Sequence, residues 1–78
     1  LFRSADSPAE TKEYSDLYLA LGQLNPDLRI TVVLYYIEGF SVKETALIQK
    51  ISEGTVKSRL SRGREKLKQL LEEQEVQI

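Results

Sequence analysis

Residues 52–67 read SEGTVKSRLSRGREKL and predict a long amphipathic helix. Ser52 is a helix-capping residue, and apolar side chains then recur on one helical face at Val56, Leu60 and Leu67. Basic side chains occupy the other faces: Lys57, Arg59, Arg62, Arg64 and Lys66. A helix with an apolar back and a cationic, hydroxyl-bearing front is suited to the major groove of DNA.

A shorter helix is predicted just before this one. Ser41 and Glu44 have the spacing of a capping box, in which each side chain accepts a hydrogen bond from the other residue's backbone N–H. We expect this helix to run to about Gln49, with Ala46 and Ile48 packed inward. Two helices with caps eleven residues apart are typical of a helix-turn-helix, whose second helix enters the groove by its first turns.

Two further helices are predicted toward the N-terminus, each opened by a cap that contains proline. The motif Ser7-Pro8-Ala9-Glu10 starts the first, which we expect to reach about Gln23. The motif Asn25-Pro26-Asp27 starts the second, which we expect to end at Glu38 beside Gly39. The expected inward stripes are Tyr14, Leu17, Tyr18, Leu21 and Leu24 in the first helix, and Ile30, Val33, Leu34 and Ile37 in the second.

The fold class that follows is all-α, with four helices and a long recognition helix reaching Glu73 or beyond. The β-branched run 30–33 favours a strand when taken alone, but its proline cap and the following glycine favour a helix. We expect residues 1–6 to be the end of a linker and residues 7–78 to form one helix-turn-helix domain. Gly63 inside the last helix costs about 1 kcal/mol relative to alanine, which indicates either close packing or a tolerated cost.

Composition argues against catalysis and against a metal or cofactor. The 78 residues contain no cysteine and no histidine, which removes disulfides, thiolate metal sites and the commonest metal ligand and general base. We therefore expect no catalytic residue, no metal and no cofactor. No apolar run approaches the roughly 20 residues of a membrane span, and the first residues given, LFRSADSP, lack the long apolar stretch of a signal peptide. The chain lacks an initiator methionine, so we expect an excised piece of a longer cytoplasmic protein.

The net charge of −1 hides a strong separation along the chain. Residues 1–51 carry −2, residues 52–68 carry +4, and residues 69–78 carry −3. The basic charge is thus concentrated in one helix, which can hold DNA locally without drawing the whole domain to any duplex. We expect weak binding by the chain alone, with further affinity supplied by a larger assembly.

The candidate DNA-binding residues all lie in the first turns of the recognition helix: Glu53, Gly54, Thr55, Lys57, Ser58, Arg59, Ser61 and Arg62. Lysine and arginine donate to guanine O6 and N7, glutamate accepts from cytosine N4, and serine or threonine serves base or phosphate. Backbone N–H groups of Gly54 and Thr55 point out of the helix start, where a phosphate is favoured.

Two blocks of the chain resemble a known protein family. The blocks VLYYIEGFSVKETA at 33–46 and GTVKSRLSRGREKL at 54–67 closely resemble region 4 of extracytoplasmic-function (ECF) sigma factors, and the likeness covers residues 24–71. The resemblance implies a subunit of bacterial RNA polymerase that selects promoters. It implies promoter DNA as a partner, read at the minus-35 element, together with docking on the flap of the polymerase β subunit. An anti-sigma factor is a further implied partner.

The resemblance also implies residue roles. Gly54 and Thr55 match phosphate contacts at the helix start, and Arg59 matches a further phosphate contact. The positions that match base and backbone contacts are Lys57, Ser58 and Arg62. Ser61 stands where the family varies its side chain, so we expect it to tune sequence preference.

Three departures from the family pattern bear on structure. Lys50 replaces the glycine usual in the turn, so we expect it to adopt a left-handed conformation at some cost. Thr45 and Gln49 replace aliphatic residues, which predicts a loosely packed third helix. Tyr35 replaces an arginine often found near the DNA.

Two alternatives remain beside this reading. The output domain of a quorum-sensing response regulator shares T-V-K but usually continues to a histidine that this chain lacks, which disfavours this alternative firmly. A helical protein-interaction module, whose cations bind an acidic partner, predicts no sequence preference on DNA. The alternative to promoter recognition is therefore binding to polymerase or an anti-sigma factor alone.

Overall fold

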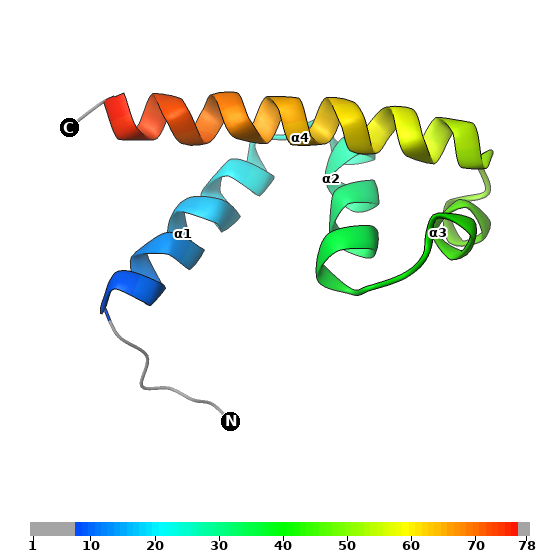
Figure 1. Cartoon of the computed structure of the whole chain (residues 1–78), viewed down its shortest axis with the longest axis horizontal. Coiled ribbons are helices and arrows are strands. Elements are labelled where there is room, and N and C mark those ends of the chain that lie inside the picture. The colour runs from blue at the N-terminus through cyan, green and yellow to red at the C-terminus, as the bar shows by residue number, and fades with distance from the viewer. Residues whose placement is uncertain (1–7, 77–78) are drawn as a thin grey trace.

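The computed structural model describes residues 8–76, in which we find four α-helices, one π-helical segment and no strand. The elements are α1 (Pro8–Gly22), α2 (Pro26–Val32), the π-helical η1 (Val33–Ile37), α3 (Val42–Gln49) and α4 (Glu53–Val76). Figure 1 shows α4 as a straight rod with the other helices placed along one side of it. The all-α prediction is confirmed. The predicted linker 1–6 and the Ser7 cap lie outside the described residues.

The predicted helix starts at α2, α3 and α4 are confirmed at atomic detail. The N–H of Asp27 donates to Asn25 Oδ1 at 2.8 Å, with Pro26 in the first helical position. Both bonds of the capping box at α3 are present, because Glu44 N–H donates to Ser41 Oγ at 3.0 Å and Ser41 N–H donates to Glu44 Oε1 at 2.9 Å. At α4 the N–H of Thr55 donates to Ser52 Oγ at 3.1 Å.

The second predicted helix changes its winding halfway along. It stays helical to Ile37, but from Val33 onward it is a π-helix, in which Glu38 N–H donates to the carbonyl of Val33 at 2.9 Å. The run of four β-branched residues 30–33 leads into this change and ends at the first residue of the π-helix, and such residues crowd the turns of an α-helix. Gly39 follows with φ +85, so the predicted end of the helix holds while its uniform α-geometry does not.

The core runs along α4 and takes side chains from every α-helix. Its buried residues are Ala20, Leu21, Leu24, Val32, Ala46, Val56, Leu60 and Leu70. Burying such apolar surface is the main favourable term in folding. The predicted apolar back of α4 is confirmed at Val56 and Leu60, and Leu67 packs half-buried beside them.

Four residues predicted to face inward are exposed instead: Tyr18, Ile30, Ile37 and Ile48. In α2 the buried positions are Thr31 and Val32, so its inward face is rotated away from the predicted stripe. The cause is that residues 32–34 continue the apolar run, and an unbroken run does not mark which side of a helix packs. Ile37 lies at the end of the π-helical η1, whose i→i+5 hydrogen bonds depart from the α-helical period on which its prediction rested.

Gly63 marks a place where α2 and α4 approach closely. Gly63 is buried, and a Cβ added to it would lie 2.6 Å from Val32 Cγ2. Of the two interpretations of this glycine, close packing is confirmed. Arg29 secures the connection before α2, because its Nη1 donates to the carbonyls of Gly22 and Leu24, each at 3.2 Å.

The turn between α3 and α4 depends on Lys50. Its backbone is left-handed, with φ 60 and ψ 46, as the family resemblance implied for a position where glycine is usual. Its N–H donates to the carbonyl of Leu47 at 3.3 Å, and the next N–H, of Ile51, donates to Ala46 at 3.0 Å. A left-handed backbone costs a residue with a side chain roughly 1–2 kcal/mol.

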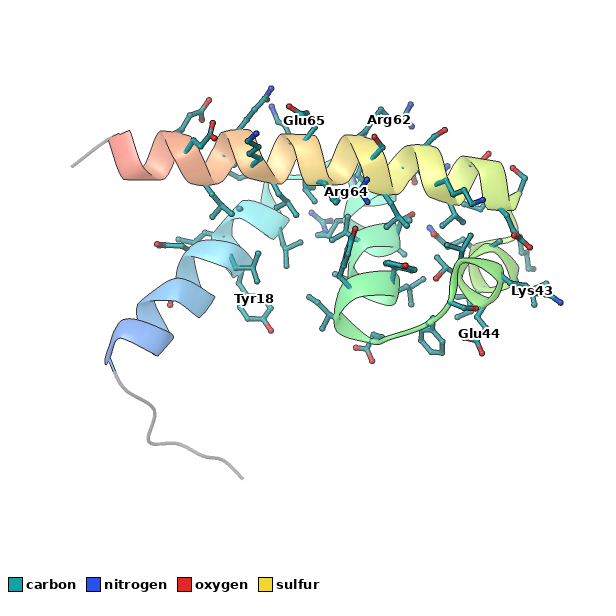
Figure 2. The ribbon with its side chains drawn as sticks, viewed as in Figure 1. Tyr18, Lys43, Glu44, Arg62, Arg64 and Glu65 are labelled. Carbon is teal, nitrogen blue, oxygen red and sulfur yellow. The ribbon has the colours of Figure 1, made fainter. Side chains whose placement is uncertain are left out.

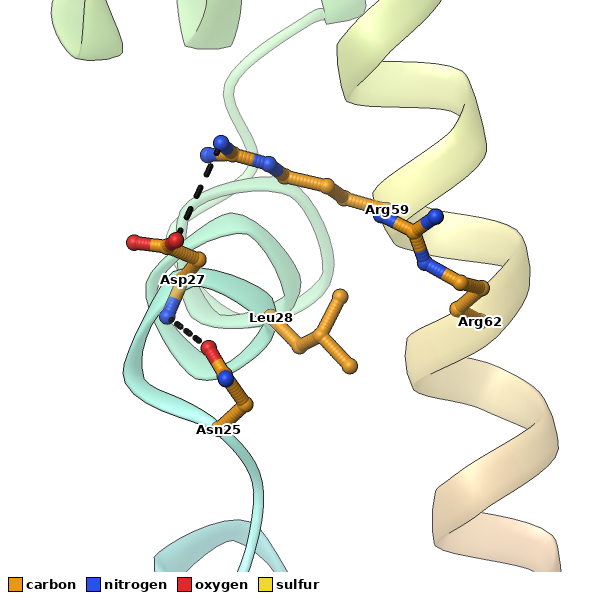
Figure 3. Close-up of a pocket in the computed structure, with 5 residues that line it drawn as sticks. All are labelled: Asn25, Asp27, Leu28, Arg59 and Arg62. Atoms are coloured by element: carbon orange, nitrogen blue, oxygen red, sulfur yellow. Dashed lines mark hydrogen bonds and ion pairs between the residues drawn. The ribbon is translucent and has the colours of Figure 1, made fainter.

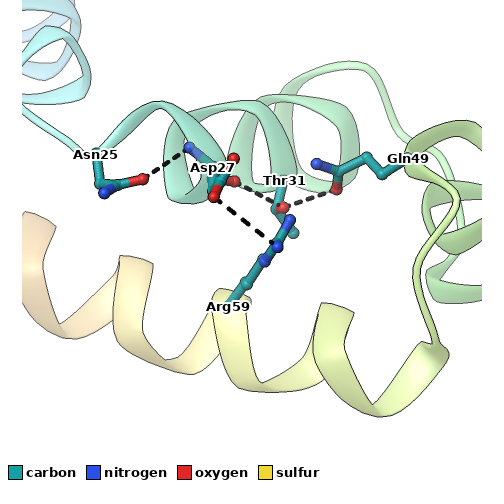
Figure 4. Close-up of polar contacts among 5 residues, drawn as sticks. All are labelled: Asn25, Asp27, Thr31, Gln49 and Arg59. Atoms are coloured by element: carbon teal, nitrogen blue, oxygen red, sulfur yellow. Dashed lines mark hydrogen bonds and ion pairs between the residues drawn. The ribbon is translucent and has the colours of Figure 1, made fainter.

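The third helix is not loosely packed, contrary to the prediction from Thr45 and Gln49. Thr45 is fully buried, and Gln49 Oε1 lies 2.7 Å from the hydroxyl of the fully buried Thr31. The same hydroxyl lies 2.9 Å from the carbonyl of Asp27 (Figure 4). A directed polar contact therefore joins the end of α3 to α2. Thr45 Oγ1 is buried without a hydrogen-bond partner in the described part of the chain.

The molecule is a thin slab, with principal extents of 39 × 33 × 15 Å. None of its helices within residues 8–76 combines the length and apolar content that a membrane crossing requires.

Candidate nucleic-acid interface

The start of α4 lies beside α3 at one end of the slab (Figure 1). Ile51 is half-buried between the two helices, and Ser52 caps α4. The two helices thus form the predicted helix-turn-helix, with the first turns of α4 at the edge of the molecule.

The exposed face of α4 carries most of the predicted DNA-binding residues. By the helical period Gly54, Ser58 and Ser61 lie together, opposite the buried Val56 and Leu60. Six of the eight candidates are exposed: Glu53, Gly54, Lys57, Ser58, Ser61 and Arg62. By the helical period all of them except Glu53 lie on or beside this face. Figure 2 shows Arg62 on the upper side of the rod in that view.

Thr55 serves the cap as well as the candidate surface. It is half-buried, and its hydroxyl lies 2.9 Å from Ser52 Oγ, which also accepts its N–H. That N–H is therefore already engaged by the cap. The N–H of Gly54 is left as the predicted backbone donor to a phosphate at this end of the helix.

Arg59 points toward another helix. Its side chain is 19% exposed, and Nη2 lies 3.9 Å from Oδ2 of Asp27 in the first turn of α2. Together with Arg62, Asn25 and Leu28, these two residues line an open cavity of about 260 Å³ between α2 and α4 (Figure 3). The cavity borders the exposed, cationic face of α4. Arg59 therefore lies at the edge of that face, and its side chain is turned toward α2.

Arg64 is also engaged within the molecule. Its Nη1 donates to the hydroxyl of Tyr36 at 2.7 Å, and Tyr36 in turn packs edge-to-face on Tyr35 with ring centroids 4.9 Å apart. Figure 2 shows Arg64 on the side of α4 that faces α2. The sequence did not predict the contact between Arg64 and Tyr36. No local pattern indicates it, because the two residues are 28 positions apart.

The described residues 8–76 hold no cluster of three or more His, Cys, Asp or Glu residues that could bind a metal ion. What the site does present is a cationic, hydroxyl-bearing helix face at the exposed second helix of a helix-turn-helix. This arrangement defines a helix-turn-helix DNA-binding domain, because such domains place that helix in the major groove.

Comparison with known proteins identifies the family. The family described as Sigma-70, region 4 matches residues 14–67, and the chain belongs to it. That match includes the whole helix-turn-helix and residues 53–67 of α4. The resemblance seen in the sequence is thereby confirmed.

The chain is similar to several curated sigma factors. It is 46% identical over 59 residues to the RNA polymerase sigma factor CarQ of Myxococcus xanthus, covering 76% of this chain and 34% of that protein. It is 44% identical over 57 residues to the ECF RNA polymerase sigma factor SigE of Mycolicibacterium smegmatis, covering 73% and 22%. SigX of Bacillus subtilis, another ECF RNA polymerase sigma factor, is 37% identical over 57 residues, covering 73% and 29%. The chain thus spans about a third or less of the length of these relatives.

Proposed function

We propose that this chain is the promoter-recognition domain of an ECF-type RNA polymerase sigma factor and reads the minus-35 element with the first turns of α4. The observation that carries the proposal is the exposed face of Gly54, Ser58 and Ser61, flanked by Lys57 and Arg62 on the second helix of a helix-turn-helix. The names of the similar proteins, all RNA polymerase sigma factors, support it.

Each exposed residue has a chemical role in this proposal. Lys57 and Arg62 donate to guanine O6 and N7 in the major groove, and Glu53 accepts from cytosine N4. Ser58 and Ser61 contact bases or phosphates, and the N–H of Gly54 donates to a phosphate at the helix start. The domain performs no chemistry itself; it positions other machinery on DNA.

Docking on the flap of the polymerase β subunit is the second part of the proposal. Apolar side chains stay exposed on the helices that do not carry the cationic face: Tyr18 and Leu19 on α1, Ile30 on α2 and Ile37 on η1. Exposed apolar side chains of this kind favour a protein partner. An anti-sigma factor would compete for the same side chains. Tethering to polymerase raises the effective concentration of the domain at DNA, which offsets its acidic net charge. The site of action is the cytoplasm.

Footprinting tests the proposal directly. Holoenzyme is reconstituted from polymerase core and the protein that carries this chain, and its protection of promoter DNA is mapped. We expect protection of a distinct upstream element that is lost with Lys57→Ala or Arg62→Ala. Holoenzyme that assembles but protects no upstream element, with or without these substitutions, would instead support a protein-interaction module without sequence-specific readout.

A further inference from the structure

Arg59 differs from its neighbours on α4 because its side chain forms an ion pair with Asp27 of α2. Lys57 and Arg62 are exposed, whereas the Arg59 side chain is 19% exposed and is directed at Asp27. The carboxylate of Asp27 is itself 70% exposed, so the pair lies at the rim of the cationic face rather than in the core. A DNA phosphate at this rim would compete with Asp27 for the same guanidinium.

The place of Asp27 is set by the fold. Its N–H donates to Asn25 Oδ1 at 2.8 Å, and its carbonyl accepts from the Thr31 hydroxyl at 2.9 Å (Figure 4). Thr31 in turn contacts Gln49 at 2.7 Å, at the end of the helix that precedes the turn. The first turn of α2 is therefore held from both directions, and it keeps the Asp27 carboxylate beside α4.

We propose that Asp27 is a positioning residue that withholds Arg59 from DNA phosphates and so limits the sequence-independent part of DNA affinity, an inference that rests on the proposed function. Ion pairs this exposed are weak, so Asp27 biases Arg59 without locking it. Phosphate contacts add affinity on any duplex, whereas base contacts discriminate. Holding back one phosphate-binding cation therefore raises the ratio of specific to nonspecific binding.

The salt dependence of binding measures this directly. Each phosphate that a protein neutralises adds about 0.9 to the slope of log affinity against log salt. Asp27→Asn is expected to free Arg59 and to steepen the slope by about 0.9. The affinity advantage of this variant over the wild type would then grow about 3.5-fold when salt falls from about 200 to about 50 mM. A purely structural effect of Asp27 would not change the slope in this way.

The experiment uses the full 78-residue chain and a short duplex of random sequence, with binding followed by fluorescence anisotropy across a salt series. Four variants are compared with the wild type: Asp27→Asn, Arg59→Gln, the double variant, and Glu38→Gln. The last is the matched control, because Glu38 follows η1 at the far end of the same helical segment and its neutralisation changes the net charge equally. Circular dichroism confirms that each variant keeps its helix content.

The proposal expects the steeper slope in Asp27→Asn, not in Glu38→Gln, and no difference between Arg59→Gln and the double variant. The same steepening in the Arg59→Gln background would overturn it, because the effect would then not pass through Arg59. Equal slopes for Asp27→Asn and the wild type, or no binding of Asp27→Asn at low salt, would overturn it too. The holoenzyme footprint is a separate experiment that does not depend on the salt slopes. It therefore shows independently whether the proposed function fails.

Discussion

Gly63 in α4 and Val32 in α2 are packed so tightly that a Cβ on the glycine would lie 2.6 Å from Val32 Cγ2. This contact brings α2 against the rod at the centre of the domain. It also explains why a glycine is found inside an otherwise uninterrupted helix, where it is intrinsically unfavourable.

Gly63→Ala is therefore expected to destabilise the domain. Alanine gains about 1 kcal/mol of helix propensity, but overpacking a stiff valine costs about 1–3 kcal/mol, so the balance is a loss of roughly 1 kcal/mol. Urea unfolding measures the change. Gly54→Ala is the matched control, because the nearest atom to its added Cβ is Ser52 Oγ at 3.9 Å. A Gly63→Ala variant as stable as the wild type would show that α2 shifts freely against α4.

Lys50→Gly is expected to stabilise the domain by about 0.5–1 kcal/mol. The left-handed backbone of Lys50, with φ 60, strains a residue with a Cβ but not glycine. The gain is reduced by the larger backbone entropy of glycine in the unfolded chain. Chemical denaturation provides the measurement, with Lys50→Ala as the control that removes the charge but keeps the Cβ. If alanine stabilises as much as glycine, charge rather than backbone strain is the cause.

Thr45→Val is expected to stabilise the domain by about 1 kcal/mol. The Thr45 hydroxyl is buried without a partner in the described residues, and a buried unsatisfied polar group costs about 1–3 kcal/mol. Thr31→Val is the contrasting control, since that hydroxyl contacts both Gln49 and Asp27 and its removal is expected to destabilise. The melting temperatures of the two variants should therefore change in opposite directions. A change in the same direction would contradict the conclusion that the Thr45 hydroxyl has no partner while that of Thr31 does.

Lys57→Ala and Arg62→Ala are expected to abolish transcription from the cognate promoter and to leave the fold intact. Both side chains are exposed on the candidate interface, so truncation removes groups that we propose to contact DNA without opening the core. Run-off transcription with reconstituted holoenzyme measures the loss, and circular dichroism checks the fold. Lys68→Ala, exposed further along α4, is the matched control for lost positive charge. Unchanged transcription in both variants would refute the α4 assignment.

Much of the fold could be predicted because its signals are local. The cap at Ser41 and Glu44 depends on two residues three positions apart. The left-handed Lys50 was expected only through the family resemblance, because the family usually has glycine at this position. The apolar face of α4 is well separated from its polar face, so the burial of Val56 and Leu60 was predicted correctly.

The rest depends on contacts between distant residues. The apolar run of α2 does not mark one side, so its rotation is decided by how Val32 meets Gly63. The pairing of Arg59 with Asp27 joins residues 32 positions apart, and nothing in either local sequence specifies it. Because such contacts cannot be read from local sequence, the prediction did not show that Arg59 and Arg64 turn toward α2 and η1.

The 15 Å thickness of the slab means that the interior is little more than a single seam of side chains. A layer this thin leaves both broad sides of every helix near solvent, and a docked protein would supply apolar cover that the domain does not provide for itself. Assembly with a partner should therefore raise the melting temperature of the domain as well as localise it, since binding only the folded form shifts the folding equilibrium.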